Sequence, residues 1–354
     1  MEVKDDRVSR WGPMRCDRCC RCAMTEPRPA RLGSIMEPGQ VSQLRRVVAA
    51  LLATATAVVA VGTVVGLIGA LEYPRLMPRS VAMAALQFKR PLFIRRGWTV
   101  ANGMKIFPDP ADDVITPYLL VFGVWEPGLT SILREKLRLG ETFVDVGANV
   151  GYYTLLAAKL VGPTGRVIAF EPVPAEFELM RRGVEANGFR RGVELEQEAL
   201  SNKRGALDLY LSPVNKGNNS IVPTRGESHV SVPAITLDED LGAGTHVDFI
   251  KMDIEGGEGF AFEGMQQTLR GNPAIELDME FEPWSLEHAG YSPRHLLDLI
   301  TGDGFILHMI DENTGALVPV SPEQLLQAYA GNRGNRDFHL DLWLSREQNP
   351  PANR

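Results

Sequence analysis

Apolar and polar residues alternate in blocks along the second part of the chain, from residue 143 to residue 344. Short runs rich in Val, Ile and Phe are bounded by turn residues, and longer segments with helical apolar spacing lie between them. The expected strands are 143–147, 166–171, 193–199, 207–211, 230–235, 247–253, 274–280, 305–310 and 338–344. The expected helices are 151–161, 174–187, 257–270 and 292–301. Such alternation predicts an α/β fold with a mostly parallel, doubly wound sheet.

Two local signals precede this alternation. Residues 98–107 read as two short strands joined at Asn102-Gly103, a dipeptide typical of tight hairpin turns. Residues 126–139 read as a helix with Gly140 as its C-terminal cap. We therefore expect a small extension of strands and helix ahead of the main sheet.

A long apolar run precedes the globular part. Residues 47–71 hold 25 residues without a charge, and about 20 apolar residues suffice for a helix to cross a bilayer, so we predict a single membrane span. A cleaved signal peptide is the alternative, but the run exceeds the usual apolar core and no clear A-x-A site follows. After the span, Pro74, Pro78 and Pro91 discourage a continuous helix over residues 72–96, which we read as a membrane-proximal connector.

The chain is acidic outside its N-terminal segment. The net charge is −7, with +4 on residues 1–46 and −11 on the rest of the chain. Because phosphate binding needs a basic surface, this balance argues against nucleic acid as the main partner. All four cysteines lie between Cys16 and Cys22, so disulfides do not hold the globular part together. We read residues 1–46 as a disordered tail, with a metal site or palmitoylation as alternatives for the cysteines and Met36 as an alternative start.

The most informative motif is the turn between the first long strand and its helix. Residues 143–153 read Phe-Val-Asp-Val-Gly-Ala-Asn-Val-Gly-Tyr-Tyr. A dinucleotide fingerprint has a second glycine where this chain has Asn149, and Asp145 would repel a diphosphate. A carboxylate beside a glycine turn instead suits a cationic nucleoside such as S-adenosylmethionine (SAM). We therefore predict that Asp145, Gly147, Asn149 and Gly151 bind SAM, with Asp145 and the turn holding its amino-acid end.

Two further groups at predicted strand ends extend this site. Glu171 ends the second strand, 24 residues after Gly147, and a carboxylate about 20 residues after such a turn can accept both ribose hydroxyls. A solvent-facing glutamate is the alternative. Glu198 and Ala199 end the third strand, where they can flank the adenine ring, although ordinary loop polarity explains them nearly as well. A flexible polar loop at residues 215–220 is a candidate to fold over the site, with an ordinary surface turn as the alternative.

Ionisable residues gather at the ends of two later strands. Lys251, Asp253 and Glu255 follow one apolar strand, and such a cluster is costly unless its members are paired or used in catalysis. We expect Lys251 to neutralise a carboxylate and Asp253 to orient a substrate hydroxyl or take its proton, with Glu255 and Glu280 as further catalytic candidates. A structural ion-pair network is the alternative. Asp253 and Glu280 also offer oxygen ligands for a divalent metal, but a polar strand edge explains them equally well, so we assign no metal site.

Four of these motifs occur in an order that resembles the FkbM-type family of SAM-dependent methyltransferases. They are Glu141–Gly151, Ala169–Pro172, Asn218–Ser220 and Ile250–Gly256. The resemblance covers roughly residues 120–312 and implies a class I methyltransferase fold, SAM as cofactor, and frequent action on hydroxyl groups of sugars or secondary metabolites. Glu126 stands where the family tends to carry an acidic residue before its glycine motif. Gly257 stands where a histidine is common, which points to a different substrate.

These observations predict a membrane-tethered methyltransferase whose acceptor is a hydroxyl-bearing small molecule, glycan or lipid-linked saccharide. Because SAM is a cytosolic metabolite, we expect the catalytic domain on the cytoplasmic side. The alternatives are a SAM-binding membrane protein without activity, and a nicotinamide-dependent oxidoreductase, which Asp145 and Asn149 disfavour. The expected division of the chain is a tail (1–46), a membrane helix (47–71), a connector (72–96), an extension (97–140), the catalytic domain (141–346) and a flexible end (347–354).

Overall fold

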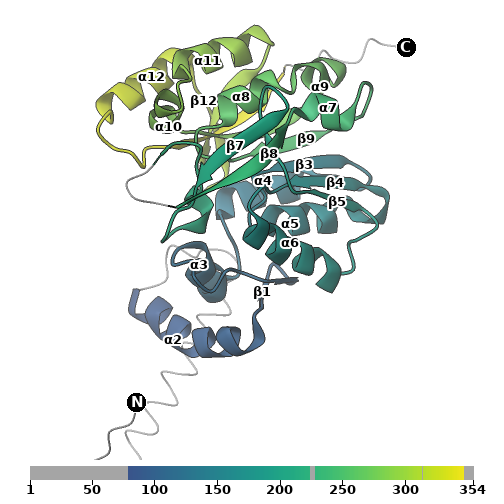
Figure 1. Ribbon diagram of the computed structural model, residues 1–354, viewed down its shortest axis with the longest axis vertical. Helices are drawn as coiled ribbons and strands as arrows, with labels where there is room; N and C mark the ends of the chain where they lie inside the picture. Colours follow the sequence, from purple (N-terminus) through teal and green to yellow (C-terminus); the bar gives the residue numbers. More distant parts are fainter. Residues whose placement is uncertain (1–78, 224–227, 313, 347–354) are drawn as a thin grey trace, which may run out of the picture. The chain divides into compact units, whose positions relative to one another are not determined.

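The computed structural model describes residues 79–223, 228–312 and 314–346 (Figure 1). The predicted membrane span at 47–71, the cysteine cluster, Met36 and the C-terminal end fall outside the described residues. Within the described ranges, no helix combines the length and the apolar character that crossing a bilayer requires.

A central sheet of eight strands organises the described residues. Its strands are β3 (Thr142–Val146), β4 (Arg166–Phe170), β5 (Val193–Glu196), β9 (Phe249–Met252), β10 (Glu276–Phe281), β11 (Ile306–Asp311), β12 (Ala316–Pro319) and β13 (Leu340–Ser345). The spatial order is β12-β11-β13-β10-β9-β3-β4-β5. The run from β10 to β5 is parallel, whereas β13 is antiparallel to both of its neighbours. This is a doubly wound, mostly parallel α/β sheet, as predicted.

A second, smaller sheet corrects one predicted strand. The residues expected as one strand, 193–199, divide between β5 of the main sheet and β6 (Ala199–Leu200). Strand β6 instead joins β8 (His229–Ile235), which also pairs with β7 (Gly205–Tyr210). The two short strands expected at 207–211 and 230–235 are therefore present and form an antiparallel pair.

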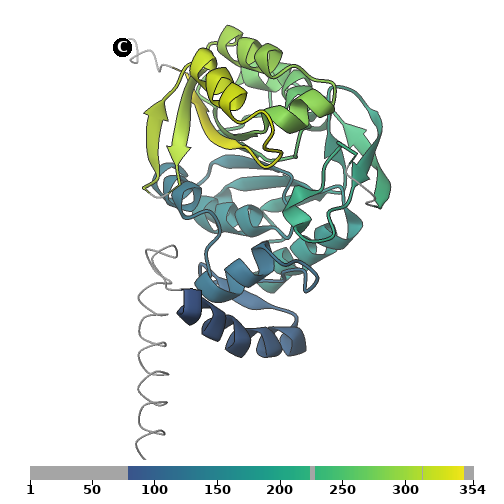
Figure 2. The same cartoon turned by 90° about the vertical axis from the view of Figure 1, so that its left-hand side faces the viewer.

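Helices cover both faces of the main sheet (Figures 1 and 2). They are α4 (Pro127–Lys136), α5 (Tyr152–Val161), α6 (Pro174–Ala186), α7 (Leu237–Leu241), α8 (Glu258–Glu263), α9 (Gln266–Gly271), α10 (Pro283–His288), α11 (Pro293–Gly302) and α12 (Pro322–Gly331). The helix expected at 257–270 is broken between α8 and α9. A Cβ on Gly264 would lie 2.0 Å from the carbonyl oxygen of Ser201, so the close approach of the β6 end accounts for a glycine at this break.

The side chains of β3 show how the two faces of the sheet are packed. Val144 and Val146 point into a core shared with α8, α9 and α11. Phe143 points into the opposite core, which α4 and α5 close. Because side chains alternate along a strand, Asp145 shares the Phe143 face and lies under α5.

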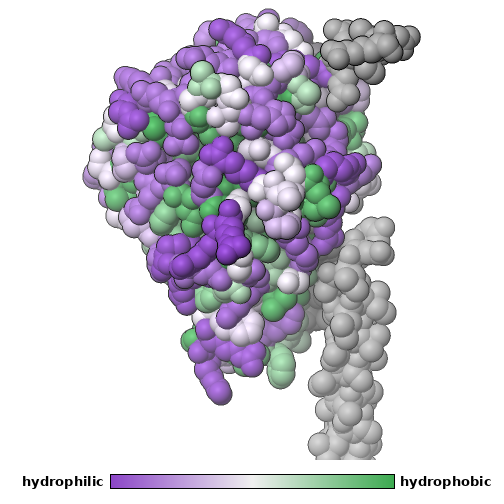
Figure 3. Space-filling view, turned by 90° about the vertical axis from the view of Figure 1, so that its right-hand side faces the viewer, coloured by the Kyte–Doolittle hydropathy of each residue, from purple (hydrophilic) through white to green (hydrophobic). Residues whose placement is uncertain are grey.

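On the side of the molecular surface shown in Figure 3, hydrophilic side chains predominate and hydrophobic ones form small separate groups.

The hairpin ahead of the sheet confirms the predicted turn. Strands β1 (Thr99–Ala101) and β2 (Met104–Ile106) pair antiparallel. Asn102 and Gly103 both have positive φ, at 51° and 72°, as a two-residue hairpin turn of this kind requires. The helix expected at 126–139 is shorter, because α4 ends at Lys136 and Leu137 is extended.

The remaining N-terminal helices correct a second expectation. Residues Arg79–Arg96 form one continuous helix, α2, with Pro91 inside it. The proline removes one backbone hydrogen-bond donor, but α2 packs against α3 (Ile115–Phe122). Phe93 is buried, and Lys89 Nζ donates to the carbonyl of Val121 at 3.3 Å. This tertiary packing accounts for a helix that the sequence disfavours.

Candidate active site

A cavity of about 950 Å³ opens at the carboxyl ends of the central parallel strands. Strand β3 lies between β4 and β9. The strands that follow β3 in sequence, β4 and β5, lie on one side of it, and the later strands β9 and β10 lie on the other. The strand order therefore reverses at β3, and open α/β sheets bind ligands at such a switch point. Residues that follow β3, β4, β9 and β10 line the cavity, including Gly147, Glu171, Asp253 and Glu280.

Glu171 is held rigidly at the end of β4. One carboxylate oxygen accepts the backbone N–H of Asn149 at 2.7 Å, and the other accepts that of Val173 at 2.8 Å. The residue is 5% exposed and lines the cavity. Burial raises the pKa of Glu171 to about 8, against the lowering effect of its two backbone donors. The structure thus fixes this carboxylate in the cavity wall, and its contact with a ribose stays a prediction.

The glycine turn serves packing as much as ligand approach. Gly147 has a φ of 80°, and a Cβ there would lie 2.0 Å from the carbonyl oxygen of Asp253, so this glycine lets the β3 and β9 ends meet. Gly147 and Asn149 line the cavity, as predicted. Gly151 does not, which corrects its assignment as a cofactor contact. A Cβ on Gly151 would lie 2.7 Å from Cγ of Met180, so it is required by α6.

The structure also corrects the role predicted for Asp145. Its side chain is fully buried and is absent from the cavity wall. Thr154 of α5 donates to its Oδ2 at 2.5 Å, while its Oδ1 has no hydrogen-bond partner among the described residues. Burial raises the pKa of Asp145, with the Lys251 ammonium opposing that rise. This carboxyl group lies beneath the site and is not part of the cavity wall.

Of the two residues predicted to flank the adenine at the end of the third strand, one lines the cavity and the other does not. Ala199 lines the cavity together with Leu200 of β6, Val173 and Leu209, so an apolar wall stands where the adenine was expected. Glu198 does not line the cavity. Its carboxylate lies with those of Glu196 and Asp240 instead, which corrects its assignment to the cofactor site.

The predicted catalytic carboxylates converge at the other end of the cavity. Lys251 Nζ lies 2.9 Å from Asp253 Oδ2, which confirms the expected neutralisation. Asp253, Glu255 and Glu280 all line the cavity, and each offers an oxygen within 4.8 Å of the others. Burial raises the pKa values of Glu255 and Glu280 well above normal, and neighbouring carboxylates raise them further.

Two groups near these carboxylates were not assigned from the sequence. Glu126 lines the cavity, and Tyr153 of α5 donates its hydroxyl to Glu126 Oε2 at 2.7 Å. Burial raises the pKa of Glu126 to about 8. Burial alone would lower the pKa of Lys251, but Asp253 and Glu126 raise it above the ordinary value. The acidic position noted before the glycine motif is therefore part of the cavity wall.

Backbone strain is concentrated at this cavity. Within the described residues, four non-glycine residues have positive φ, and three of them line the cavity: Glu126, Asn149 and Glu255. Such conformations cost about 1–3 kcal/mol each and persist where the surroundings impose them. The polar loop at 215–220 helps to hold two of these residues in place. Its Lys216 carbonyl accepts a hydrogen bond from Asn149 Nδ2 at 3.0 Å, and Ser220 Oγ donates one to the Glu255 carbonyl at 2.5 Å.

Comparison with known proteins shows which family this part of the chain resembles. Residues 145–307 match the family model of the methyltransferase FkbM domain. Methyltransferase sdnD of Sordaria araneosa is 32% identical over 111 residues, which are 30% of this chain and 42% of sdnD. Methyltransferase 1 of Beauveria bassiana is 28% identical over 159 residues, 38% of this chain and 63% of that protein. The chain thus spans less than two thirds of either relative.

Among solved structures, a SAM-dependent O-methyltransferase from Thermotoga maritima aligns with a TM-score of 0.37 and 11% identity. The alignment covers 72% of this chain and 79% of that one. The family match contains the glycine turn, Glu171 and the Lys251–Glu255 segment that line the cavity. Residues 145–307 therefore resemble the methyltransferase FkbM domain.

Proposed function

We propose that this protein is a SAM-dependent methyltransferase that modifies a hydroxyl group of a sugar, glycan, lipid-linked saccharide or secondary metabolite. One observation carries the proposal: a single cavity is lined at its β4 end by the fixed carboxylate of Glu171 and, across β3, at its β9 and β10 end by the carboxylates of Asp253, Glu255 and Glu280. The first end fits a nucleoside, and the second fits an acceptor that loses a proton.

The residues at the first end fit SAM. The Glu171 carboxylate is fixed by two backbone donors and retains lone pairs for the ribose hydroxyls. The apolar wall of Val173, Ala199 and Leu200 provides contact area for an adenine ring. With Asp145 beneath the cavity, Glu126 is the acidic wall residue left for the cationic amino-acid end, whose positive charge would favour the ionised form of this carboxyl group.

Asp253 is the leading candidate for the acceptor side. SAM supplies a methyl group on a sulfonium, so that transfer forms an O–C bond, breaks the S–C bond and leaves the electron pair on sulfur. The acceptor hydroxyl loses its proton in the same process. The Lys251 ammonium fixes Asp253, whose side chain is 29% exposed, so one carboxylate oxygen is oriented to bind that hydroxyl and accept the proton. Glu255 and Glu280 flank it.

Methyl transfer is tested by incubating the full chain with isotope-labelled SAM and glycan, lipid or metabolite extracts. A labelled product that is lost in Asp253→Asn and retained in Glu196→Gln supports the proposal, since Glu196 lies outside the cavity wall. Tight binding of SAM with no labelled product from any extract supports the non-catalytic alternative. Binding of a nicotinamide nucleotide without binding of SAM supports an oxidoreductase.

The membrane tether is part of the proposal. We infer that residues 47–71 cross the membrane once and hold the domain on the cytoplasmic side, where a lipid-linked acceptor is accessible. Helix α2, close behind this run, exposes Phe88 (80%) and Ile94 (65%) beside Arg95, a composition suited to a membrane surface. Extraction of the protein from membranes by high salt alone would contradict the span.

A further inference from the structure

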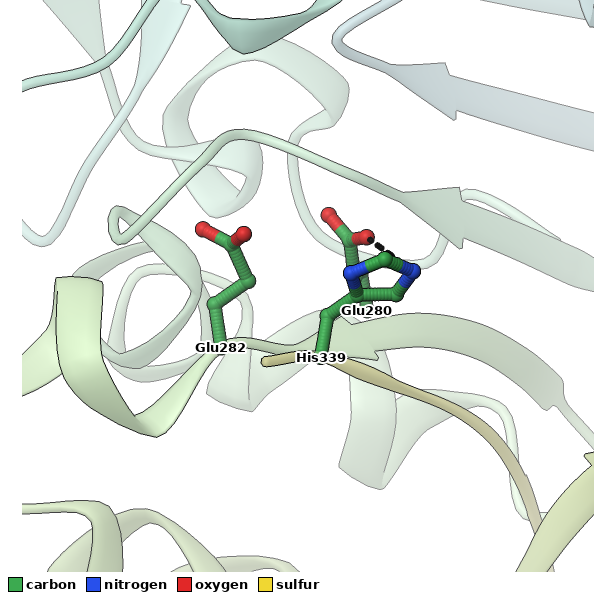
Figure 4. Close-up of side chains that lie close together, drawn as sticks. All are labelled: Glu280, Glu282 and His339. Atoms are coloured by element: carbon green, nitrogen blue, oxygen red, sulfur yellow. Dashed lines mark ion pairs between the residues drawn. The ribbon is translucent and has the colours of Figure 1, made fainter. Parts of the chain in front are cut away.

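A second group of potential ligands lies at the rim of the cavity, at the end of β10. Glu280 is in β10, Glu282 directly follows that strand, and His339 directly precedes β13. Strands β10 and β13 pair antiparallel with Phe281 opposite Leu340, and this register brings the three side chains together (Figure 4). Each offers one ligand atom within 4.8 Å of the other two. We call them the Glu280–Glu282–His339 cluster.

The imidazole of His339 is set up to offer a lone pair to this cluster. Its Nδ1 lies 3.1 Å from the carbonyl oxygen of Asp337, and a carbonyl only accepts, so Nδ1 carries the proton. When the imidazole binds a metal in its neutral form, Nε2 is therefore the nitrogen that offers the lone pair, and it lies 3.8 Å from Glu280 Oε1. Metal-binding histidines commonly use this second hydrogen bond to fix the tautomer. Two ligand atoms about 2.1 Å from one ion are at most about 4.2 Å apart, so 3.8 Å allows a shared ion.

Glu282 provides an independent sign of a missing partner. The residue is 5% exposed, and its Oε2 has no hydrogen-bond partner within the described ranges. Figure 4 shows its carboxylate beside that of Glu280, on the same side of the strand end as the His339 ring. An orphaned buried carboxylate oxygen is costly, and a cation bound among the three side chains would satisfy it.

The buried ammonium group of Lys251 does not form an ion pair with this cluster. Lys251 Nζ binds Asp253 Oδ2 at 2.9 Å. Across the described part of the chain, the ion pairs of Glu280 and Glu282 include neither a lysine nor an arginine; that of Glu280 is with His339. Two carboxylates thus face one imidazole, with no ion pair to a long basic side chain among the described residues.

We propose that the Glu280–Glu282–His339 cluster binds a divalent transition-metal cation. Two carboxylates and one imidazole favour ions of the Mn²⁺ and Fe²⁺ type over Ca²⁺, which prefers oxygen ligands throughout. All three residues line the cavity, so the ion faces the same space as Asp253. Resting on the proposed function, this places an oxygen-rich acceptor as a ligand of the ion, while the binding of the metal itself does not depend on methyl transfer.

The test is Mn²⁺ binding to the full chain, freed of metal by chelation, followed by electron paramagnetic resonance of the free ion. We expect one Mn²⁺ per chain with a dissociation constant below about 100 µM. His339→Ala and Glu282→Gln are each expected to weaken binding at least about tenfold. His339 lies at the surface, with half of its side chain exposed, so its removal is compatible with folding.

The matched control is Glu196→Gln. Glu196 belongs to another acidic group, with Glu198 and Asp240, whose carboxylate oxygens lie equally close together but which has no histidine. Binding retained in Glu196→Gln and lost in His339→Ala supports the site. Absence of bound Mn²⁺ at millimolar concentration, or equal weakening in both variants, overturns it. Calorimetry with SAM in the absence of metal tests the proposed function separately, so the two failures are distinguishable.

Discussion

Replacing Gly147 by alanine tests how the β3 and β9 ends support the site. The residue has a φ of 80°, which costs a non-glycine residue about 1–2 kcal/mol. The new Cβ would lie 2.0 Å from the Asp253 carbonyl oxygen, so this backbone must move by about 1 Å or more, and such overpacking costs about 1–3 kcal/mol. We expect the free energy of unfolding to fall by about 2–5 kcal/mol.

The same displacement reaches the catalytic side chain. A shift of about 1 Å in a positioning group can lower turnover about 100-fold, and here the group that moves is Asp253 itself. Gly188→Ala is the matched control, because Gly188 has a similar φ of 77° but no atom lies within 4 Å of the position that its new Cβ would take. Denaturant unfolding and transfer of labelled methyl groups are the assays. If Gly147→Ala were no more destabilising than Gly188→Ala and left turnover unchanged, the reasoning would be refuted.

Three further substitutions test individual residues. Burial raises the folded-state pKa of Glu171 to about 8, so its contribution to stability is full below about pH 4.5 and is lost as pH rises toward 8, by at most about 1.4 kcal/mol per pH unit; other buried carboxyl groups add to this slope, so unfolding at several pH values should show a smaller slope in Glu171→Gln than in the wild type. Gly151→Ala should lower the free energy of unfolding by about 1–2 kcal/mol, because its φ is 82°, yet leave the calorimetric affinity for SAM unchanged; a large loss of affinity would return Gly151 to the cofactor contacts. Asp253→Asn should lower turnover about 100-fold or more with little change in the KM for SAM, whereas wild-type kinetics would remove Asp253 from proton transfer.

The sequence predicts the central strands well because each is a short, continuous apolar run. Buried parallel strands need no polar face, so β3, β4 and β9 stand out from their surroundings. The hairpin was also predictable, since Asn102 and Gly103 tolerate the positive φ that the turn needs. Glu171 and Asp253 followed from the same logic, because residues at the carboxyl ends of adjacent parallel strands face one site.

The errors arise from contacts between distant segments. Helix α2 tolerates Pro91 because it packs on α3, and the 257–270 helix breaks where Gly264 meets Ser201. Asp145 lies under α5 because strand periodicity puts it on the Phe143 face. That misassignment was avoidable, since the alternation is visible in the sequence.

The Glu280–Glu282–His339 cluster could not be found from the sequence. It depends on the antiparallel register of β10 with β13, which joins residues far apart along the chain. A turn or a spacing motif signals ligands that are close in sequence, but no local pattern around His339 indicates its partners. Glu280 was noted as a catalytic candidate, but its proximity to His339 became visible only from the fold.

Calorimetric titration of the full chain with S-adenosylhomocysteine, the product that would remain after methyl transfer, tests the central claim most directly. We expect one binding site for S-adenosylhomocysteine. Its affinity should fall at least about tenfold in Glu171→Gln and should be unaffected in Glu196→Gln. Absence of binding, together with heat on addition of a nicotinamide dinucleotide, would contradict it.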